Sequence, residues 1–291
     1  MPQHSAPSLK GKIALVTGAS RGIGRAFAQR LASAGATVVV TARSLNVTKS
    51  EPGTLAETVS LIEKNGGRAI PIAADLENAG ERASLVDRAI EAAGGLDILI
   101  NNAGYAKYAK IEDMSDEVYD LTMDHYLRAP FVLARAAIPH MKKTGAGWIV
   151  NVGSATGMPG LKPYNVFDTD GGSTLYAAVK AAVNRFTQGL AAELLASNIA
   201  VNMVGPSTAI RTPGAVRYIP DEYPGEQIEY IAETALQLCY LPAAERTGLL
   251  AYSMHFPAGM KFKVFSLDGK TEMPPAEIPV WSHPAMLPKG E

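Results

Sequence analysis

The segment Thr17-Gly-Ala-Ser-Arg-Gly-Ile-Gly24 carries the strongest structural signal in the chain. It lies between an apolar run, 13–17, and an Ala-rich segment of helical character, 22–34. Glycines at positions 18, 22 and 24 let the backbone turn sharply and approach a pyrophosphate, whose charge the N-terminus of the following helix stabilises. Because this glycine spacing is informative only between a strand and a helix, its placement predicts a nucleotide-binding site.

Short apolar runs alternate with longer helical segments over the first 204 residues, a pattern typical of βαβ units. The expected strands are 13–17, 37–41, 69–73, 97–100, 148–152 and 199–204. The expected helices lie near 22–34, 54–65, 78–93, 115–143 and 174–197. The strands are apolar almost throughout, which suits a sheet covered on both faces. The sequence therefore predicts an α/β fold with one doubly wound parallel sheet and helices on both faces.

The whole chain, 1–291, is predicted to be a single domain. Its residues are 47% hydrophobic and 19% charged, which places it among folded globular chains. We expect a core over about 10–253 that includes a helix near 226–241 and a seventh strand near 247–253. A proline-rich C-terminal extension over 254–291 follows, and it is atypical for this fold.

The composition excludes several classes of function. Lys and Arg number 27 against 28 Asp and Glu, and the sequence contains no basic run that could follow a nucleic-acid backbone. No apolar run reaches the ~18 residues of a membrane span, and the first ten residues lack the apolar core of a signal peptide. The single cysteine, Cys239, is expected to be a buried apolar residue. We therefore expect a cytoplasmic protein without a metal site and without nucleic-acid or membrane partners.

Two arginines near the predicted nucleotide site indicate which dinucleotide it binds. In such folds an acidic residue about 20 positions after the glycines holds the 2′-hydroxyl of NAD, whereas an arginine suits the 2′-phosphate of NADP. Here the second strand ends in Thr41-Ala-Arg-Ser44, and the next acid is Glu51. Arg21 and Arg43 therefore favour NADP(H) over NAD, with two solvated surface arginines as the alternative interpretation.

Tyr176 and Lys180 lie four residues apart at the start of the expected helix 174–197, so they share one helix face. A lysine cation close to a phenol favours its ionised form, and we expect Lys180 to lower the pKa of Tyr176 from about 10 toward neutrality. Tyr176 is thus a candidate general acid/base. The alternative is that Lys180 is a solvated helix lysine and that Ser154, after the fifth strand, is a turn residue.

With these motifs in order, the chain resembles the short-chain dehydrogenase/reductase family over roughly residues 10–212. The resemblance is carried by the segments Thr17–Gly24, Asp75-Leu76, Asn101-Asn-Ala-Gly104, Ser154, Tyr176-x-x-x-Lys180 and Val201-Asn-Met-Val-Gly-Pro206. It implies a Rossmann-like fold, a homodimer or homotetramer, and NADP(H)-dependent interconversion of a carbonyl and a secondary alcohol. Together with the composition of the loops, it suggests a mostly apolar small molecule as the substrate.

The resemblance also implies a role for each matching residue. Ser154 would hold the substrate oxygen, Tyr176 would give or take its proton as hydride is transferred, and Lys180 would contact the nicotinamide ribose. Hydride transfer builds negative charge on that oxygen, which a positioned donor stabilises most in the transition state. The residues implied to bind the cofactor are Gly18, Ser20, Arg21, Gly22, Ile23, Gly24, Arg43, Ser44, Asp75, Leu76, Asn102, Ala103, Gly104, Tyr176, Lys180 and Pro206.

The chain departs from the family pattern in two places near the site. Tyr126 stands where the family has an asparagine that holds a water for the proton relay, and it is interpreted either as a pocket residue or as a core aromatic. The loop 158–173 is longer than usual. It is expected either to place Tyr164, Val166 and Phe167 against an apolar substrate or to pack on a neighbouring subunit.

Two other functions remain open on the sequence alone. Tyr126 and the unusual C-terminus are compatible with an NADP(H)-binding sensor or scaffold with little turnover. A dehydratase or epimerase could use the same fold and would form product without a net change in NADPH.

Overall fold

The computed structural model describes residues 7–46, 53–105, 107–164, 166–216, 219 and 221–287, so Glu51 and the ends of the chain lie outside the described residues. Within these ranges the centre of the fold is a parallel sheet with the strand order β3-β2-β1-β4-β5-β6-β7. The strands are β1 (Ile13–Thr17), β2 (Thr37–Ala42), β3 (Arg68–Ala73), β4 (Ile98–Asn101), β5 (Gly147–Val152), β6 (Ile199–Gly205) and β7 (Leu250–Tyr252). The predicted doubly wound α/β fold is confirmed.

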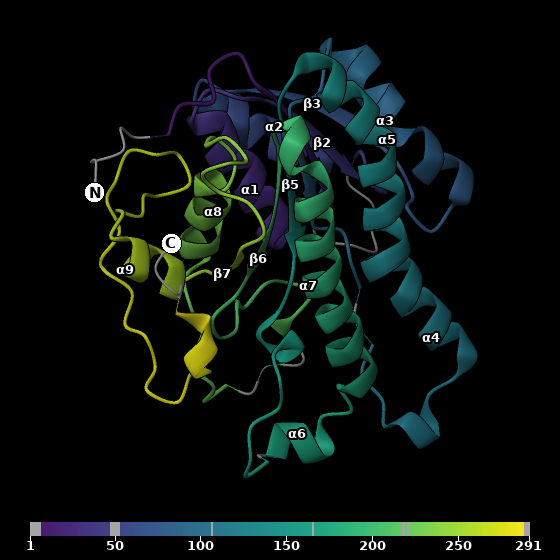
Figure 1. The fold of residues 1–291 in the computed structure, drawn as a ribbon, viewed down its shortest axis with the longest axis vertical. Helices are drawn as coiled ribbons and strands as arrows, with labels where there is room; N and C mark the ends of the chain where they lie inside the picture. Colours follow the sequence, from purple (N-terminus) through teal and green to yellow (C-terminus); the bar gives the residue numbers. More distant parts are fainter. Residues whose placement is uncertain are drawn as a thin grey trace.

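Helices cover both faces of the sheet (Figure 1). One face carries α1 (Gly22–Ser33), α2 (Leu55–Lys64) and α8 (Ile228–Gln237). The other carries α3 (Ala79–Ala93), α5 (Ala129–Thr144) and α7 (Thr174–Leu194). Successive strand residues therefore enter different cores, and this explains why the strands are apolar on both sides.

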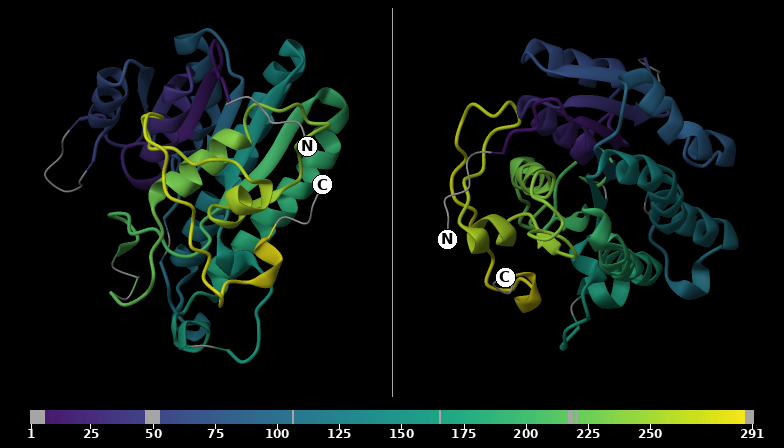
Figure 2. Two further views of the ribbon diagram at one scale, coloured as in Figure 1. Left: turned by 90° about the vertical axis from the view of Figure 1, so that its left-hand side faces the viewer. Right: turned by 45° about the horizontal axis from the view of Figure 1, so that its top comes forward.

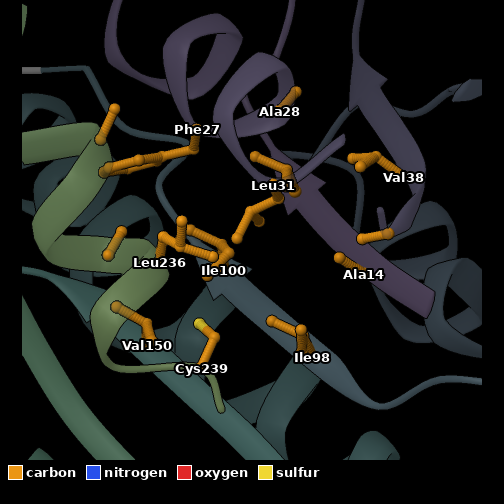
Figure 3. Packing of buried hydrophobic residues seen from close by; sticks show 14 of the residues in the cluster. Ala14, Phe27, Ala28, Leu31, Val38, Ile98, Ile100, Val150, Leu236 and Cys239 are labelled. Carbon is orange, nitrogen blue, oxygen red and sulfur yellow. The ribbon is translucent and has the colours of Figure 1, made fainter. Parts of the chain in front are cut away.

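The core on the α1 side shows how this packing works (Figure 3). Ile98 and Ile100 of β4 point into it, whereas Leu99 between them enters the opposite core. Phe27 of α1 and Leu236 of α8 belong to the same cluster and cover the sheet from the helix side. Cys239 is fully buried in the same cluster, as the sequence predicted.

The expected helix 115–143 is interrupted in the structure. It consists of α4 (Asp116–Met123), a π-helical turn (Asp124–Arg128) and α5. The reason is Pro130, which has no N–H to donate to the carbonyl of Tyr126 four residues earlier. The wider turn forms instead, and the Ala129 N–H donates to the carbonyl of Asp124, five residues back.

The C-terminal extension is folded and packs on the rest of the molecule. After β7 it forms α9 (His255–Met260) and follows the side of the molecule that carries α8 (Figure 2). The Phe265 N–H donates to Glu233 of α8, and a short 3₁₀ turn, Pro284–Met286, lies near the end of the described chain. Other short elements are α6 (Val166–Asp170) and the 3₁₀ turns Ile111–Asp113, Ala155–Gly157 and Leu195–Ser197. Among all the described helices, none is long and apolar enough to cross a membrane.

Candidate active site

A cavity of about 1510 Å³ lies at the carboxyl ends of the strands. Segments that follow β1, β2, β3, β4, β5 and β6 all contribute to its wall, as expected for the ligand-binding edge of an open parallel sheet. All the residues predicted from the sequence to bind the cofactor or to carry the chemistry line this one cavity. They are Gly18, Ser20, Arg21, Gly22, Ile23, Gly24, Arg43, Ser44, Asp75, Leu76, Asn102, Ala103, Gly104, Ser154, Tyr176, Lys180 and Pro206.

The glycine turn between β1 and α1 is tightly folded. Gly18 has φ +65° and Gly22 has φ +56°, a backbone region that favours glycine. A Cβ on Gly24 would lie 2.2 Å from the Gly18 carbonyl oxygen, so no side chain fits there. The turn brings the first N–H groups of α1 to the cavity, where they can meet an anionic group.

Hydrogen bonds of Thr17 and Asn102 connect the turn to the segment that follows β4. The Thr17 hydroxyl accepts from the N–H groups of Asn102 and Ala103, at 2.9 and 3.0 Å. The Asn102 amide donates to the carbonyl oxygens of Thr17 (2.8 Å) and Gly18 (3.3 Å). Asn102 therefore shapes the turn with its side chain, a role that the sequence motif did not reveal.

Charged side chains lie at the end of the cavity beyond β2 and β3. Arg43 pairs with Glu77, with 3.5 Å between Nη1 and Oε1. His125, from the π-helical turn, reaches the same carboxylate at 3.2 Å. Arg21 also lines the cavity, at the start of α1. Arg21 and Arg43 thus both line the cavity, and Arg43 is paired with a carboxylate there.

Ser154, Tyr176 and Lys180 come together beyond β5. Thr156 donates to the Ser154 hydroxyl oxygen through both its N–H (3.2 Å) and its hydroxyl (2.9 Å), which leaves the Ser154 proton for Tyr176. Lys180 is only 3% exposed and donates from Nζ to the carbonyl of Val152 at 2.8 Å. The C-terminal ends of β5 and the start of α7 therefore place a hydroxyl, a phenol and an amine at one point.

The protonation of this cluster differs from the sequence expectation. Burial raises the pKa of Tyr176 to about 12, although the hydrogen bond from Ser154 acts to lower it. Burial also lowers the pKa of Lys180 to about 7. The expectation that Lys180 lowers the tyrosine pKa is therefore wrong for this structure. The reason is that desolvation disfavours the charged form of both groups.

Tyr126 is a pocket residue. Its ring face lies 4.1 Å from Lys180 Nζ, and its ring packs edge-on against that of Tyr176 with 5.4 Å between centroids. Gly104 makes room for it, since a Cβ there would lie 2.3 Å from the ring. Of the two interpretations of Tyr126, the structure favours the one that places it in the pocket, where its ring covers the lysine.

The loop 158–173 reaches the cavity in part. Tyr164 and Phe167 line it, whereas Val166 is 77% exposed to solvent. The loop is docked on the segment after β4, where the Ala109 N–H donates to the carbonyl of Gly172 at 3.1 Å. Lys110 pairs with Asp170 at the same place, at 3.2 Å.

Several cavity residues could not be named from motifs. They share an aromatic or thioether side chain and belong to no motif, so no local spacing signals them. They are Tyr105, Tyr108, Met158, Tyr223, Trp281 and Met286. Only the unusual aromatic and proline content of the loops could have drawn attention to them. Among the described residues, no group of three or more His, Cys, Asp or Glu side chains could hold a metal ion.

Comparisons with known proteins agree with this architecture. The family model described as short chain dehydrogenase matches residues 12–221. An uncharacterized oxidoreductase of Thermotoga maritima is 38% identical over 201 residues, covering 69% of this chain and 73% of the relative. A hydroxynaphthalene reductase-like protein, Arp2, of Metarhizium majus is 35% identical over 238 residues, covering 80% and 83%.

Solved structures give the same result. A putative short-chain alcohol dehydrogenase from Sinorhizobium meliloti is 34% identical, with a TM-score of 0.71 and coverage of 84% of this chain and 96% of that one. A putative NAD(P)-dependent gluconate 5-dehydrogenase from Beutenbergia cavernae, with bound NADP at low occupancy, is 28% identical. Its TM-score is 0.73, with coverage of 85% and 97%. This chain belongs to the short-chain dehydrogenase/reductase family of oxidoreductases.

Proposed function

We propose that the protein is an NADP(H)-dependent oxidoreductase that interconverts a carbonyl and a secondary alcohol on a mostly apolar small molecule. The observation that carries this proposal is the meeting of Ser154, Tyr176 and Lys180 in the cavity that the glycine turn also lines. A proton donor and a dinucleotide cradle that share one cavity are the two parts that such a reaction needs.

The glycine turn fits a dinucleotide. The turn has no side chains at Gly18, Gly22 and Gly24, so a pyrophosphate can approach its backbone closely. The N-terminus of α1 lines the same cavity. NADPH supplies a hydride when it is bound. Pro206 and Lys180 would flank its nicotinamide ribose, and Asp75 and Leu76 its adenine.

The preference for NADP over NAD rests on Arg43 and Arg21. Both line the cavity next to the turn, and a guanidinium pairs with the 2′-phosphate that distinguishes NADP. The NADP in the Beutenbergia cavernae structure is consistent with this preference.

In the chemical step, Ser154 and Tyr176 act on the substrate oxygen. Ser154, oriented by Thr156, holds the substrate oxygen, and Tyr176 exchanges a proton with it. With a pKa of about 12, the Tyr176 phenol is protonated at neutral pH, which is the form that donates a proton to a carbonyl oxygen being reduced.

The variant Tyr176→Phe tests the proposal because it removes the proton donor and keeps the ring. We expect NADPH consumption with a panel of apolar ketones to fall by about 10²- to 10⁴-fold. NADPH binding, followed by nucleotide fluorescence, should remain. Tyr119→Phe is the matched control, since Tyr119 is 49% exposed on α4.

The outcomes separate the candidate functions. Wild-type protein that binds NADPH tightly and reduces no ketone would favour the sensor or scaffold. Product formation without NADPH consumption would favour a dehydratase or epimerase. Equal kcat/KM with NADPH and NADH would contradict the cofactor preference.

A further inference from the structure

The C-terminal segment Trp281–Met286 is held against the cavity by three separate contacts. Met286 is 4% exposed and packs on Met203 of β6 and Tyr252 of β7. His283 Nε2 lies 3.1 Å from the carbonyl of Pro159, in the loop after β5. The third contact is the hydrogen bond between the hydroxyl of Ser282 and His255 Nε2, at 2.9 Å. A segment fixed at three points presents its remaining side chains in one arrangement.

His255 connects this segment to the loop after β6. It is 1% exposed, and its Nδ1 lies 2.9 Å from the hydroxyl of Ser207, the residue after Pro206. The Ser207 oxygen also accepts from the Met254 N–H at 2.9 Å. Ser207 and Ser282 both line the cavity. The buried His255 therefore links the loop after β6, through Ser207, to the C-terminal segment, through Ser282.

Aromatic side chains form part of the cavity wall. Of the chain's 11 tyrosines, seven phenylalanines and two tryptophans, eight residues line it. Tyr108 packs edge-on against Tyr176 at 5.4 Å and near Phe167 at 6.4 Å between centroids. Trp281 of the C-terminal segment packs against Tyr223 at 5.6 Å and is still 52% exposed. Exposed aromatic faces and edges favour an aromatic ligand, because rings pack edge-to-face or offset on one another.

From these contacts we propose that segment Trp281–Met286 is a specificity-determining wall of the substrate site, positioned by His255, and that it selects carbonyl compounds that carry an aromatic ring. The proposal rests on the proposed function and names its substrate class. Trp281 contacts the ring of the substrate. His255 is a positioning residue, since it acts through Ser207 and Ser282.

The experiment compares 2-tetralone with 2-decalone. The two ketones share a carbon skeleton, and neither carbonyl is conjugated to a ring, so they differ in the aromatic ring. We expect kcat/KM of the wild-type protein with NADPH to be about tenfold higher for 2-tetralone. Trp281→Leu should remove most of this preference through a higher KM, with kcat largely kept. Val280→Ala is the matched control, because Val280 is adjacent and fully exposed.

His255 is tested with two substitutions that each retain one bond. Asn places its amide near the position of Nδ1 and keeps the contact with Ser207, whereas Gln reaches the position of Nε2 and keeps the contact with Ser282. We expect His255→Asn to lose the 2-tetralone preference and His255→Gln to retain it. Thermal unfolding of each variant checks that it is folded. If His255 had a purely structural role, both substitutions would change the 2-tetralone preference to the same extent.

Binding provides a readout that does not depend on turnover. Calorimetry with the NADP⁺ complex should give a lower Kd for 2-naphthol than for 2-decalol in the wild-type protein, and Trp281→Leu should bring the two values together. Equal Kd values, binding of neither alcohol, or a preference unchanged in Trp281→Leu would overturn this inference. Such results leave the proposed function standing if ketones are reduced, whereas a loss of all ketone reduction counts against the proposed function itself.

Discussion

At the scale of single residues, Lys180 shows how strongly the surroundings set the chemistry of a side chain. Its amine is almost fully buried, and desolvation lowers its pKa to about 7. Two contacts favour the charged form against this effect. They are the hydrogen bond to the Val152 carbonyl and the face of the Tyr126 ring at 4.1 Å. Tyr126 thus acts on the lysine, whose Nζ lies 5.5 Å from the centroid of the Tyr176 ring.

Replacement of Tyr126 by leucine is expected to lower the pKa of Lys180 further, by about one unit, because the cation loses the negative face of the ring. The titration is followed by NMR of protein labelled with ¹³C-lysine. Tyr126→Phe keeps the ring face and serves as the control. Identical lysine pKa values in the Leu and Phe variants would show that the ring does not stabilise the cation.

At the scale of elements, the connection between β1 and α1 is packed so closely that no side chain fits at position 24. The Gly18 carbonyl and the Asn102 amide occupy the space beside Gly24, at 2.2 and 2.5 Å from the position of a Cβ. The carbonyl belongs to the turn itself and cannot move away without breaking the bond from Asn102. This close approach, rather than a positive φ, makes glycine necessary at position 24.

Gly24→Ala is expected to destabilise the protein by about 1–3 kcal/mol and to weaken NADPH binding at least tenfold, because the added methyl group forces the turn open. Urea unfolding and fluorescence titration measure the two effects. Gly189→Ala introduces the same methyl group in the middle of α7, where the nearest atom is 3.7 Å away. That variant should be about 0.5–1 kcal/mol more stable than the wild-type protein. Equal effects of the two substitutions would contradict the steric argument.

At the scale of the whole molecule, a buried carboxyl joins three distant segments behind the cavity. Glu226 is 9% exposed and accepts from the Ser253 hydroxyl, after β7, at 2.6 Å. It also accepts from the Ser207 N–H, after β6, at 3.0 Å. Through Ser207 it is linked to His255 and so to the C-terminal segment. Burial raises the pKa of Glu226 to about 7, from an ordinary value of 4.5.

A raised carboxyl pKa makes the folded state less stable as the pH rises. Below about pH 4.5 Glu226 is protonated in both states, and between about 4.5 and 7 the unfolded chain ionises first and is favoured. Glu226→Gln removes this effect. Relative to the wild-type protein, its free energy of unfolding should rise by about 3 kcal/mol between pH 4 and pH 8.

Urea unfolding at several pH values measures this difference. Glu222→Gln is the control, since Glu222 is exposed a few residues away in the same loop. A stability difference between wild type and Glu226→Gln that does not depend on pH would show that Glu226 ionises equally easily in the folded and unfolded states.

The strands, the glycine turn and the convergence of the motifs on one edge of the sheet were predictable from the sequence. They depend on local requirements: strand-length apolar runs, glycines where the backbone is crowded, and the rule that parallel strands end at a common edge. The interruption of the helix after Met123 was not predicted, although its cause is local, since Pro130 lacks the N–H that a regular turn needs.

The pKa values of Tyr176 and Lys180 and the aromatic wall of the cavity were decided only by the tertiary structure. A pKa depends on how much solvent the fold removes, and spacing along a helix contains no measure of burial. Trp281 lies 105 residues after Tyr176 in the chain and reaches the same cavity because His255, Met286 and Pro159 hold its segment there. Such contacts join residues with no fixed separation in sequence, and only the packed molecule brings them together.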